Sequence, residues 1–236
     1  LEDDIRLHIP ELPDLGHTVQ IKHLISHTSG YREYLNTLAM AGRNPLDPIR
    51  RQEIIQMVQR QEELQNVPGE VWNYNNTGYA LLATVIERIS GMDFAGWMQQ
   101  EIFLPLSMEN TRVRRHAREI IPRRPMGYLP VSDDSFEEAP DLDAAMGAGG
   151  MYTTLDDLTR WINHLFEPVL GSGELMARMT ENFILNGGDT TIYGMGLMTD
   201  SLGGLLRYHH GGADLAHRSQ FMIFPQIKGA VVTQSN

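Results

Sequence analysis

Two short motifs, far apart in the sequence, carry side chains that could do chemistry together. The first is Tyr74-Asn75-Asn76, directly before a helical run that starts at Thr77. The second is His210-Gly211-Gly212, at the end of a strand-like run. A phenol beside a carboxamide can move a proton and hold an amide. Glycine at a strand end lets a substrate backbone approach, because no side chain stands in the way.

Either motif alone has a plainer interpretation. Tyr-x-Asn is more often a helix entry with a buried tyrosine, and His-Gly-Gly is more often the point where a strand turns. The functional interpretation depends on order and context: a supporting helix, Tyr-x-Asn at a helix start, a glycine turn at 147–150, then His-Gly-Gly. Agreement among these weak signals favours one site built by both motifs.

The composition is ordinary for a globular chain. It has 236 residues, 42% hydrophobic and 21% charged, which suits one large domain or two small ones. The formal net charge of −11 argues against nucleic acid as a partner, because phosphate binding needs a basic face. Absence of cysteine excludes disulfides, cysteine metal sites and a thiol nucleophile. No apolar run approaches the roughly 18 residues of a membrane span.

The N-terminus gives no information about compartment. The chain starts at Leu1 and shows no signal peptide, so we expect a fragment of a longer protein. A lack of cysteine suits exported and cytosolic proteins equally. A periplasmic or secreted location and a cytoplasmic one both stay open.

The apolar periodicity predicts a helical region followed by strands. The expected helices cover residues 21–25 (closed by Gly30), 51–63, 77–90 (stopped by Gly91), 94–103, 154–166 (opened by a capping box at Thr154 and Asp157) and 174–183. Residues 112–146 are rich in proline and acidic residues and are expected to be loops. Runs 205–209, 219–224 and 229–233 predict an antiparallel meander. We therefore divide the chain into a mainly helical region, 1–188, and a strand region, 189–236.

Histidines raise the alternative of a metal site. His23 and His27 stand four residues apart and could face one metal, but no glutamate follows His23 and no third ligand is evident. A metallohydrolase built from His209, His210, His217 and His23 is a further alternative that no ligand spacing supports. We therefore favour structural roles, with no metal and no cofactor.

The motifs together resemble the serine β-lactamase and penicillin-binding-protein superfamily, in its class C β-lactamase, D-aminopeptidase and esterase branch. The resemblance covers essentially the whole chain. It includes the supporting segment 18–30, the glycine turn and helix at 147–161, and 192–198, which resembles a family strand. It implies an α+β, β-lactamase-like fold with a helical domain and part of an antiparallel sheet. The N-terminal strands, the nucleophile helix and the C-terminal helix of the family would be missing.

The resemblance also implies roles for individual residues. Tyr74 matches the tyrosine that shares base and relay work, and Asn76 matches the asparagine that holds the substrate amide. His210 opens the third motif, where histidine suits the esterase and aminopeptidase branch. Ala213 matches the backbone oxyanion donor, and Gly211, Gly212 and Arg218 are expected to contact substrate. The sequence departs from the family at Asp214 and Ala216, which puts fine substrate preference in doubt.

The family's first motif, Ser-x-x-Lys, is absent. The only two lysines are Lys22 and Lys228, and three residues before them stand Val19 and Pro225. A tyrosine with an ordinary pKa near 10 is a poor base unless a cation lies beside it. We therefore expect the chain to be inactive by itself. Loss of a core helix and outer strands should leave an apolar groove and open sheet edges, and so favour self-association or a complementing segment.

Two functions remain after these steps. The first is a serine-type acyl hydrolase in the full-length parent, acting on a small ester, a D-amino-acid peptide or a β-lactam through an acyl-enzyme. A histidine at the third motif favours the esterase or aminopeptidase branch over β-lactams. The alternative is a pseudoenzyme or binding module that keeps the fold for recognition. The coding sequence upstream of Leu1 discriminates the two.

Overall fold

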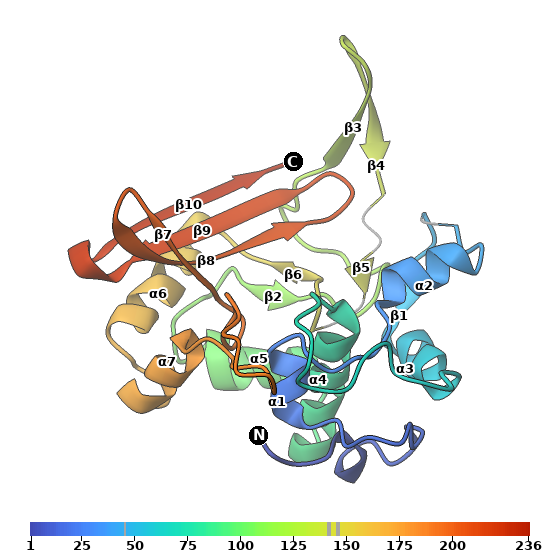
Figure 1. Ribbon diagram of the computed structural model, residues 1–236. Coiled ribbons are helices and arrows are strands. Elements are labelled where there is room, and N and C mark those ends of the chain that lie inside the picture. The colour runs from blue at the N-terminus through green and yellow to red at the C-terminus, as the bar shows by residue number, and fades with distance from the viewer. Residues whose placement is uncertain (45, 141–142, 145–146) are drawn as a thin grey trace.

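A computed structural model describes residues 1–44, 46–140, 143–144 and 147–236 of the chain. The N-terminal helices form one group, and a sheet from the C-terminal segment lies beside it (Figure 1). The fold is α+β with antiparallel strand pairing in its largest sheet, as the sequence predicted.

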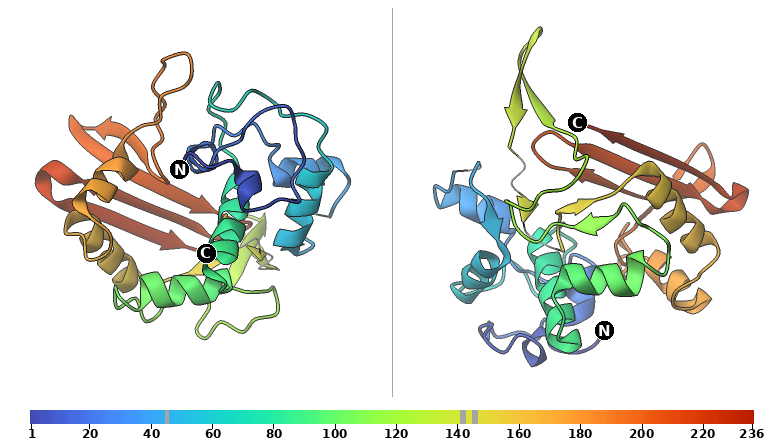
Figure 2. Two further views of the ribbon diagram at one scale, coloured as in Figure 1. Left: turned by 90° about the horizontal axis from the view of Figure 1, so that it is seen from below. Right: turned by 180° about the vertical axis from the view of Figure 1, so that it is seen from behind.

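The largest sheet has four antiparallel strands in the order β10-β9-β8-β7. They are β7 (Met198–Leu202), β8 (Leu205–Ala213), β9 (Arg218–Phe224) and β10 (Gly229–Ser235). Their register pairs His210 with Phe221 and Gly212 with Ser219. Strands β8, β9 and β10 were predicted, and β7 was missed. Helix α6 (Leu155–Phe166) packs along β10, which places a helical layer against one side of this sheet (Figure 2).

Apart from α4, which has 15 residues, the remaining helices and strands are short. The helices are η1 (Ile5–Leu7), α1 (Ile21–Ile25), α2 (Tyr34–Met40), α3 (Arg51–Gln59), α4 (Asn76–Ser90), α5 (Phe94–Met98), the π-helical η2 (Gln99–Phe103), α7 (Gly173–Thr180) and η3 (Pro225–Ile227). Three two-stranded pairs complete the fold: β1 (Ile49–Arg50) with β5 (Asp143–Ala144), β2 (Arg112–Val113) with β6 (Met151–Tyr152), and β3 (Gly127–Ser132) with β4 (Ser135–Ala139).

Helix α4 is the central helix of the N-terminal group. Asn75 caps it, since its Oδ1 accepts the N–H of Gly78 at 3.1 Å. Gly91 ends it in the left-handed conformation, with φ of 71°, as predicted. Its apolar face lies in a core shared with η1, α1 and α3, whose buried members are Ile5, Ile9, Leu12, Val19, Leu24, Tyr31, Ile55, Val58, Leu81 and Val85. This packing fixes the position of the helix start that follows Tyr74.

Several helix boundaries differ from the prediction. Helix α3 ends at Gln59, not at residue 63, and α2 was not foreseen. Helix α1 ends with Ser26 as its C-cap, so Gly30 does not close it. Gly30 has φ of 77°, and a Cβ there would stand 2.2 Å from the carbonyl oxygen of Asn66. Glycine is therefore required at this position, because the backbones of two loops approach closely there.

Residues 112–146 are not a simple loop, as the prediction had it. They contain the β3–β4 hairpin, whose register joins Gly127 to Ala139 and whose turn holds Asp133 and Asp134. Pro130 lies within β3, and a two-stranded hairpin tolerates it because both strands are edges. Positions 141–142 and 145–146 of this segment lie outside the described residues.

Only half of the predicted capping box forms at α6. The Oγ1 of Thr154 accepts the N–H of Asp157 at 3.2 Å. The carboxylate of Asp157 does not reach back to the cap. It is buried and accepts from the Asn110 N–H at 2.8 Å and the Thr111 hydroxyl at 2.7 Å. A buried acid here ties α6 to the segment before β2.

In the segment 192–198, only Met198, the first residue of β7, lies in a strand. The N–H of Gly194 bonds the carbonyl of Leu197 at 2.8 Å, and an isolated bridge joins Tyr193 to Met198. The division into regions 1–188 and 189–236 stays a prediction. Within the part of the chain that the structure describes, no helix combines the length and the apolar character that crossing a membrane requires.

Candidate active site

Tyr74 lies on the extended segment that leads into α4. Its ring is 38% exposed, so one face is open to solvent. The other face packs on the buried His27, with ring centroids 4.1 Å apart. Helix α4 begins two residues later, so the phenol stands beside the N-terminus of a rigid helix.

His210 lies on β8 and bonds through both ring nitrogens. Its Nδ1 stands 2.6 Å from the carbonyl oxygen of Gly211, and its Nε2 stands 3.1 Å from the hydroxyl of Tyr193. A carbonyl only accepts, so Nδ1 carries the proton and Tyr193 donates to Nε2. Burial lowers the pKa of His210, which favours this neutral form.

The structure brings the two motifs together. The ring centroids of Tyr74 and His210 are 6.0 Å apart, and Tyr193 lies 6.3 Å from the first and 5.9 Å from the second. A third aromatic residue thus joins the motif before α4 to the motif on β8. The chemical roles expected for Tyr74 and His210 stay predictions.

Asn76 does not present a free carboxamide. Its backbone N–H donates to Glu33 Oε2 at 2.5 Å, and its Nδ2 donates to Glu33 Oε1 at 3.3 Å. Glu33 is also the N-cap of α2, where it accepts the N–H of Leu35 at 3.3 Å. A substrate amide would therefore share Asn76 with this carboxylate.

The electrostatics around Tyr74 disfavour a phenolate. Burial, and then the charge of Glu33, raise the pKa of Tyr74. Neither lysine is beside it: Lys22 pairs with Glu2 at 2.5 Å and Lys228 with Glu167 at 3.4 Å. With its proton in place, the Tyr74 hydroxyl can donate to a substrate, and it needs a further cation to act as a base.

The glycines of the second motif are crowded by β9 side chains. A Cβ at Gly211 would stand 2.7 Å from Gln220 Oε1, and one at Gly212 would stand 2.6 Å from Ser219 Oγ. Both glycines are exposed. Side chains here would press on flexible neighbours and cover the strand, so glycine keeps this backbone open.

Ala213 and Arg218 end the two strands opposite each other. The Nη1 of Arg218 donates to the carbonyl oxygens of Asp214 and His217, each at 2.7 Å. The guanidinium therefore holds the β8–β9 turn. Its expected contact with substrate stays a prediction, as does the oxyanion role of the Ala213 N–H.

The histidines considered for a metal have separate partners. The Nε2 of His209 lies 3.3 Å from Asp200, and the Nδ1 of His217 lies 3.0 Å from Asp214. The Nδ1 of His23 accepts the N–H of Gln20 at 3.2 Å. Among the residues that the structure describes, no three His, Asp or Glu side chains gather as a metal site would require.

Three residues at the site were missed by the sequence interpretation. Tyr193 was considered only as part of a strand, His27 as half of a metal pair and as part of the supporting segment 18–30, and Glu33 not at all. Tyr193, between Ile192 and Gly194, offers no local signal for its contact with His210. A histidine directly before Thr-Ser-Gly offers one weak signal, since a polar ring in a tight turn needs partners.

Comparison with known proteins identifies the class. The whole chain, residues 1–236, matches the family model described as Beta-lactamase. The chain therefore belongs to the Beta-lactamase family, as the resemblance predicted.

Similar proteins are penicillin-binding and D-amino-acid-processing proteins. Penicillin-binding protein 4* of Bacillus subtilis is 34% identical over 227 residues, which cover 89% of this chain and 49% of that protein. A D-aminopeptidase of Gluconobacter oxydans is 26% identical, covering 100% of this chain and 44% of the relative. The octameric penicillin-binding protein homologue from Pyrococcus abyssi superposes with a TM-score of 0.85 at 23% identity, covering 100% and 56%. The chain spans about half the length of the curated relatives it matches.

Proposed function

We propose that this chain is the substrate-holding part of a serine-type acyl hydrolase whose nucleophile and base lie in a segment outside the 236 residues. The observation that carries the proposal is the contact between the two motifs, with the rings of Tyr74 and His210 6.0 Å apart. Tyr74 relays a proton to the leaving group, and the N–H of Ala213 contributes to the oxyanion hole. The D-aminopeptidase and penicillin-binding proteins among its relatives support hydrolysis as the reaction class.

The substrates we favour are small esters and amides of D-amino acids. His210 is neutral and bound to Tyr193, so it offers no fixed cation for a β-lactam carboxylate. Arg218 is engaged in the turn. β-Lactams are therefore the weakest substrates of the three classes considered.

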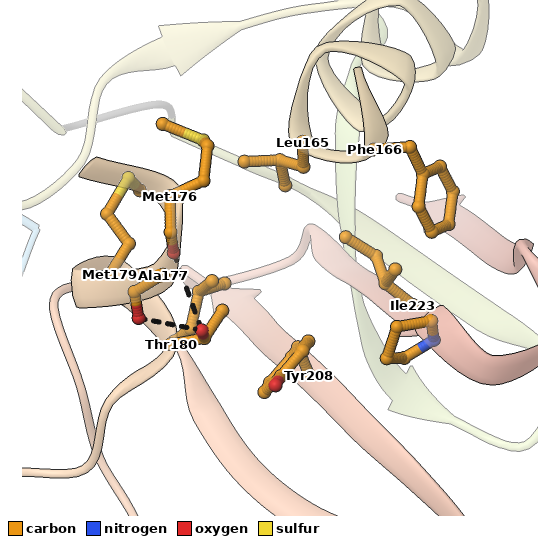
Figure 3. Close-up of a pocket in the computed structure, with 10 residues that line it drawn as sticks. Leu165, Phe166, Met176, Ala177, Met179, Thr180, Tyr208 and Ile223 are labelled. Carbon is orange, nitrogen blue, oxygen red and sulfur yellow. Dashed lines mark hydrogen bonds between the residues drawn. The ribbon is translucent and has the colours of Figure 1, made fainter. Parts of the chain in front are cut away.

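An apolar pocket offers the place where the missing segment would dock. It has a volume of about 180 Å³ and lies between α6, α7 and strands β8 and β9 (Figure 3). Its lining is almost entirely apolar: Leu165, Phe166, Met176, Ala177, Met179, Thr180, Leu197, Tyr208, Ile223 and Pro225. Tyr208 precedes His210 by two residues and so shares its face of the sheet. Apolar side chains of that segment seated here would lie on the face of β8 that His210 shares.

The test adds that segment in trans. The chain alone should not hydrolyse an activated ester, a D-phenylalanine anilide or a chromogenic cephalosporin above background. A peptide encoded upstream and containing Ser-x-x-Lys should restore hydrolysis of the first two, and the same peptide with serine replaced by alanine is the control. Turnover by the chain alone that disappears in Tyr74→Phe would instead show a nucleophile within these residues.

A non-catalytic binding module is the second candidate. The observation that favours it is the absence of Ser-x-x-Lys from the sequence. A start codon at the position of Leu1, with specific binding of a D-amino-acid amide and no turnover, would establish it. In that case the same contacts between Tyr74, Tyr193 and His210 would serve recognition.

Self-association is the remaining alternative for covering exposed surface. Strand β10 is a sheet edge among the described strands, and most of its residues are exposed. We expect the chain alone to form dimers or larger species by light scattering. Addition of the complementing peptide should shift it to a one-to-one complex.

A further inference from the structure

His27 is the most buried member of the aromatic cluster at the site. It is 1% exposed, and its ring lies 4.1 Å from that of Tyr74, 5.0 Å from Tyr79 and 4.5 Å from Tyr193. Tyr193 in turn bonds His210. One imidazole therefore touches both the residue before α4 and the residue that holds the β8 motif.

His27 also bonds the chain on both sides of Tyr74. Its carbonyl oxygen accepts the N–H of Asn73 at 2.9 Å. Its Nδ1 accepts the N–H of Asn75 at 3.0 Å. The carbonyl of Asn75 lies 3.1 Å from the same nitrogen, but as the cap of α4 this carbonyl accepts a helical N–H. We assign Nδ1 as the acceptor of the Asn75 N–H, which places the hydrogen on Nε2, a buried nitrogen that has no hydrogen-bond partner among the described residues.

The backbone of His27 is strained. Its φ of 59° is in the left-handed region, which non-glycine residues seldom adopt. Such strain persists where surrounding contacts fix it, and it concentrates at functional sites. Here the fixing contacts are the two bonds to residues 73 and 75 and the three packed tyrosines.

We propose that His27 is a positioning residue: its carbonyl binds Asn73 and its neutral imidazole binds Asn75, which clamps Tyr74 between them, and its ring, through Tyr193, sets the spacing between Tyr74 and His210. The clamp concerns the geometry of Tyr74. Its catalytic consequence rests on the proposed function.

The first test measures the tautomer in the unmodified chain. ¹⁵N chemical shifts of the histidine rings at neutral pH should show His27 neutral, with its hydrogen on Nε2 and a hydrogen bond from the Asn75 amide to Nδ1. A hydrogen on Nδ1, or a protonated ring, would overturn the proposal whatever the protein catalyses.

The second test separates the bond from the ring. His27→Asn keeps an oxygen acceptor near the Nδ1 position and tolerates the left-handed backbone, whereas His27→Phe keeps the ring and loses the acceptor. We expect the Asn75 amide to exchange within a few-fold of wild type in His27→Asn and at least about tenfold faster in His27→Phe. The amides of β8 and β9 serve as the internal reference. Equal exchange of the Asn75 amide in both variants and in wild type would overturn the clamp. If His27→Phe does not fold, the exchange in His27→Asn and the tautomer measurement decide whether the clamp exists.

A kinetic measurement tests the link to catalysis. In the chain complemented with its Ser-x-x-Lys segment, His27→Phe should lower kcat with little change in KM, because loss of the clamp displaces a phenol that acts in the transition state, whereas His27→Asn should stay closer to wild type. If the exchange and tautomer results hold while no complemented activity exists, the clamp stands and the proposed hydrolase function fails. If activity exists and His27→Asn and His27→Phe leave it unchanged, the positioning role fails.

Discussion

The two sides of the candidate site are held by different forces. The side before α4 is buried: His27, Asn75 and Thr77 are almost inaccessible, and their bonds join segments far apart in the sequence. The β8–β9 side is exposed, and local bonds within the turn hold it. Asp214 there accepts the N–H groups of Ala216 and His217 at 2.9 and 2.6 Å.

This difference predicts where rigidity lies. Breaking a buried bond leaves a polar group without water, whereas an exposed turn exchanges its bonds with solvent at little cost. The Tyr74 side should therefore be stiff and sensitive to substitution, and the His210 side should be adjustable. An adjustable glycine strand beside a stiff phenol suits a site that admits substrates of differing size.

Acid should have the largest effect on the free energy of unfolding, and it should act through buried histidines on the side before α4. Burial lowers the pKa of His27 and of His23 to about 4. Both folded-state values lie below the unfolded value of about 6.5, so the unfolded chain binds more protons between them. Stability is complete above about pH 6.5 and is lost as the pH falls towards 4, by on the order of 3 kcal/mol for each histidine.

Urea unfolding at a series of pH values checks this expectation. His27→Asn removes one of the two histidines whose pKa is lowered to about 4, so the loss between pH 6.5 and 4 should be smaller by on the order of 3 kcal/mol. A free energy of unfolding that is flat across this interval would contradict burial as the cause.

Asn75→Ala should be the next largest effect. The side chain caps α4 through the N–H of Gly78, and its Nδ2 donates to the buried carbonyl of Tyr31 at 2.7 Å. Loss of a cap costs about 1 kcal/mol, and a buried carbonyl left unpaired costs a further 1–3, so we expect about 3 kcal/mol in denaturant unfolding.

A matched cap provides the control for that variant. Ser172 caps α7 by accepting the N–H of Leu175 at 3.2 Å, but it is exposed, and its side chain makes no second bond to any residue that the structure describes. Ser172→Ala should cost about 1 kcal/mol or less. Equal losses in the two variants would remove the distinction between a buried and an exposed cap.

The sequence could predict the buried side better than the exposed one. The start and end of α4 were foreseen within one residue, because Gly91 is a strong stop signal and the apolar stripe is regular. The strands of the meander were foreseen by composition. β7 was missed, because Met198–Leu202 has only one large apolar residue at each end.

Contacts made across the fold could not be predicted from local pattern. The bond from Tyr193 to His210, and those from Glu33 to Asn76, join residues that no periodicity relates. Motif order indicated that Tyr74 and His210 meet, but it could not indicate which aromatic residue lies between them. The left-handed His27 is likewise fixed by its neighbours, since even histidine, which is enriched among non-glycine residues of positive φ, seldom adopts that conformation.

Tyr193→Phe should have an intermediate effect and should act on the junction between the two sides. It removes the hydroxyl that donates to His210 Nε2, at a cost of about 1 kcal/mol. The ¹⁵N shifts of His210 should then show an Nε2 without its hydrogen bond. Tyr208→Phe removes a phenol two residues before His210 and should leave those shifts unchanged.

Asp214→Ala should have the smallest effect on stability, less than about 1 kcal/mol, because its bonds are exposed to water. Its effect on local order should be clear nonetheless. The amides of Ala216 and His217 lose their acceptor, so their hydrogen exchange should accelerate by about tenfold while the Asn75 amide is unchanged. Asn75→Ala should show the reverse pattern: hydrogen exchange should accelerate at the start of α4 and should be unchanged in the β8–β9 turn. If Asp214→Ala also accelerates exchange at Asn75, the two sides are one cooperative unit, and the separation into a stiff and an adjustable side is wrong.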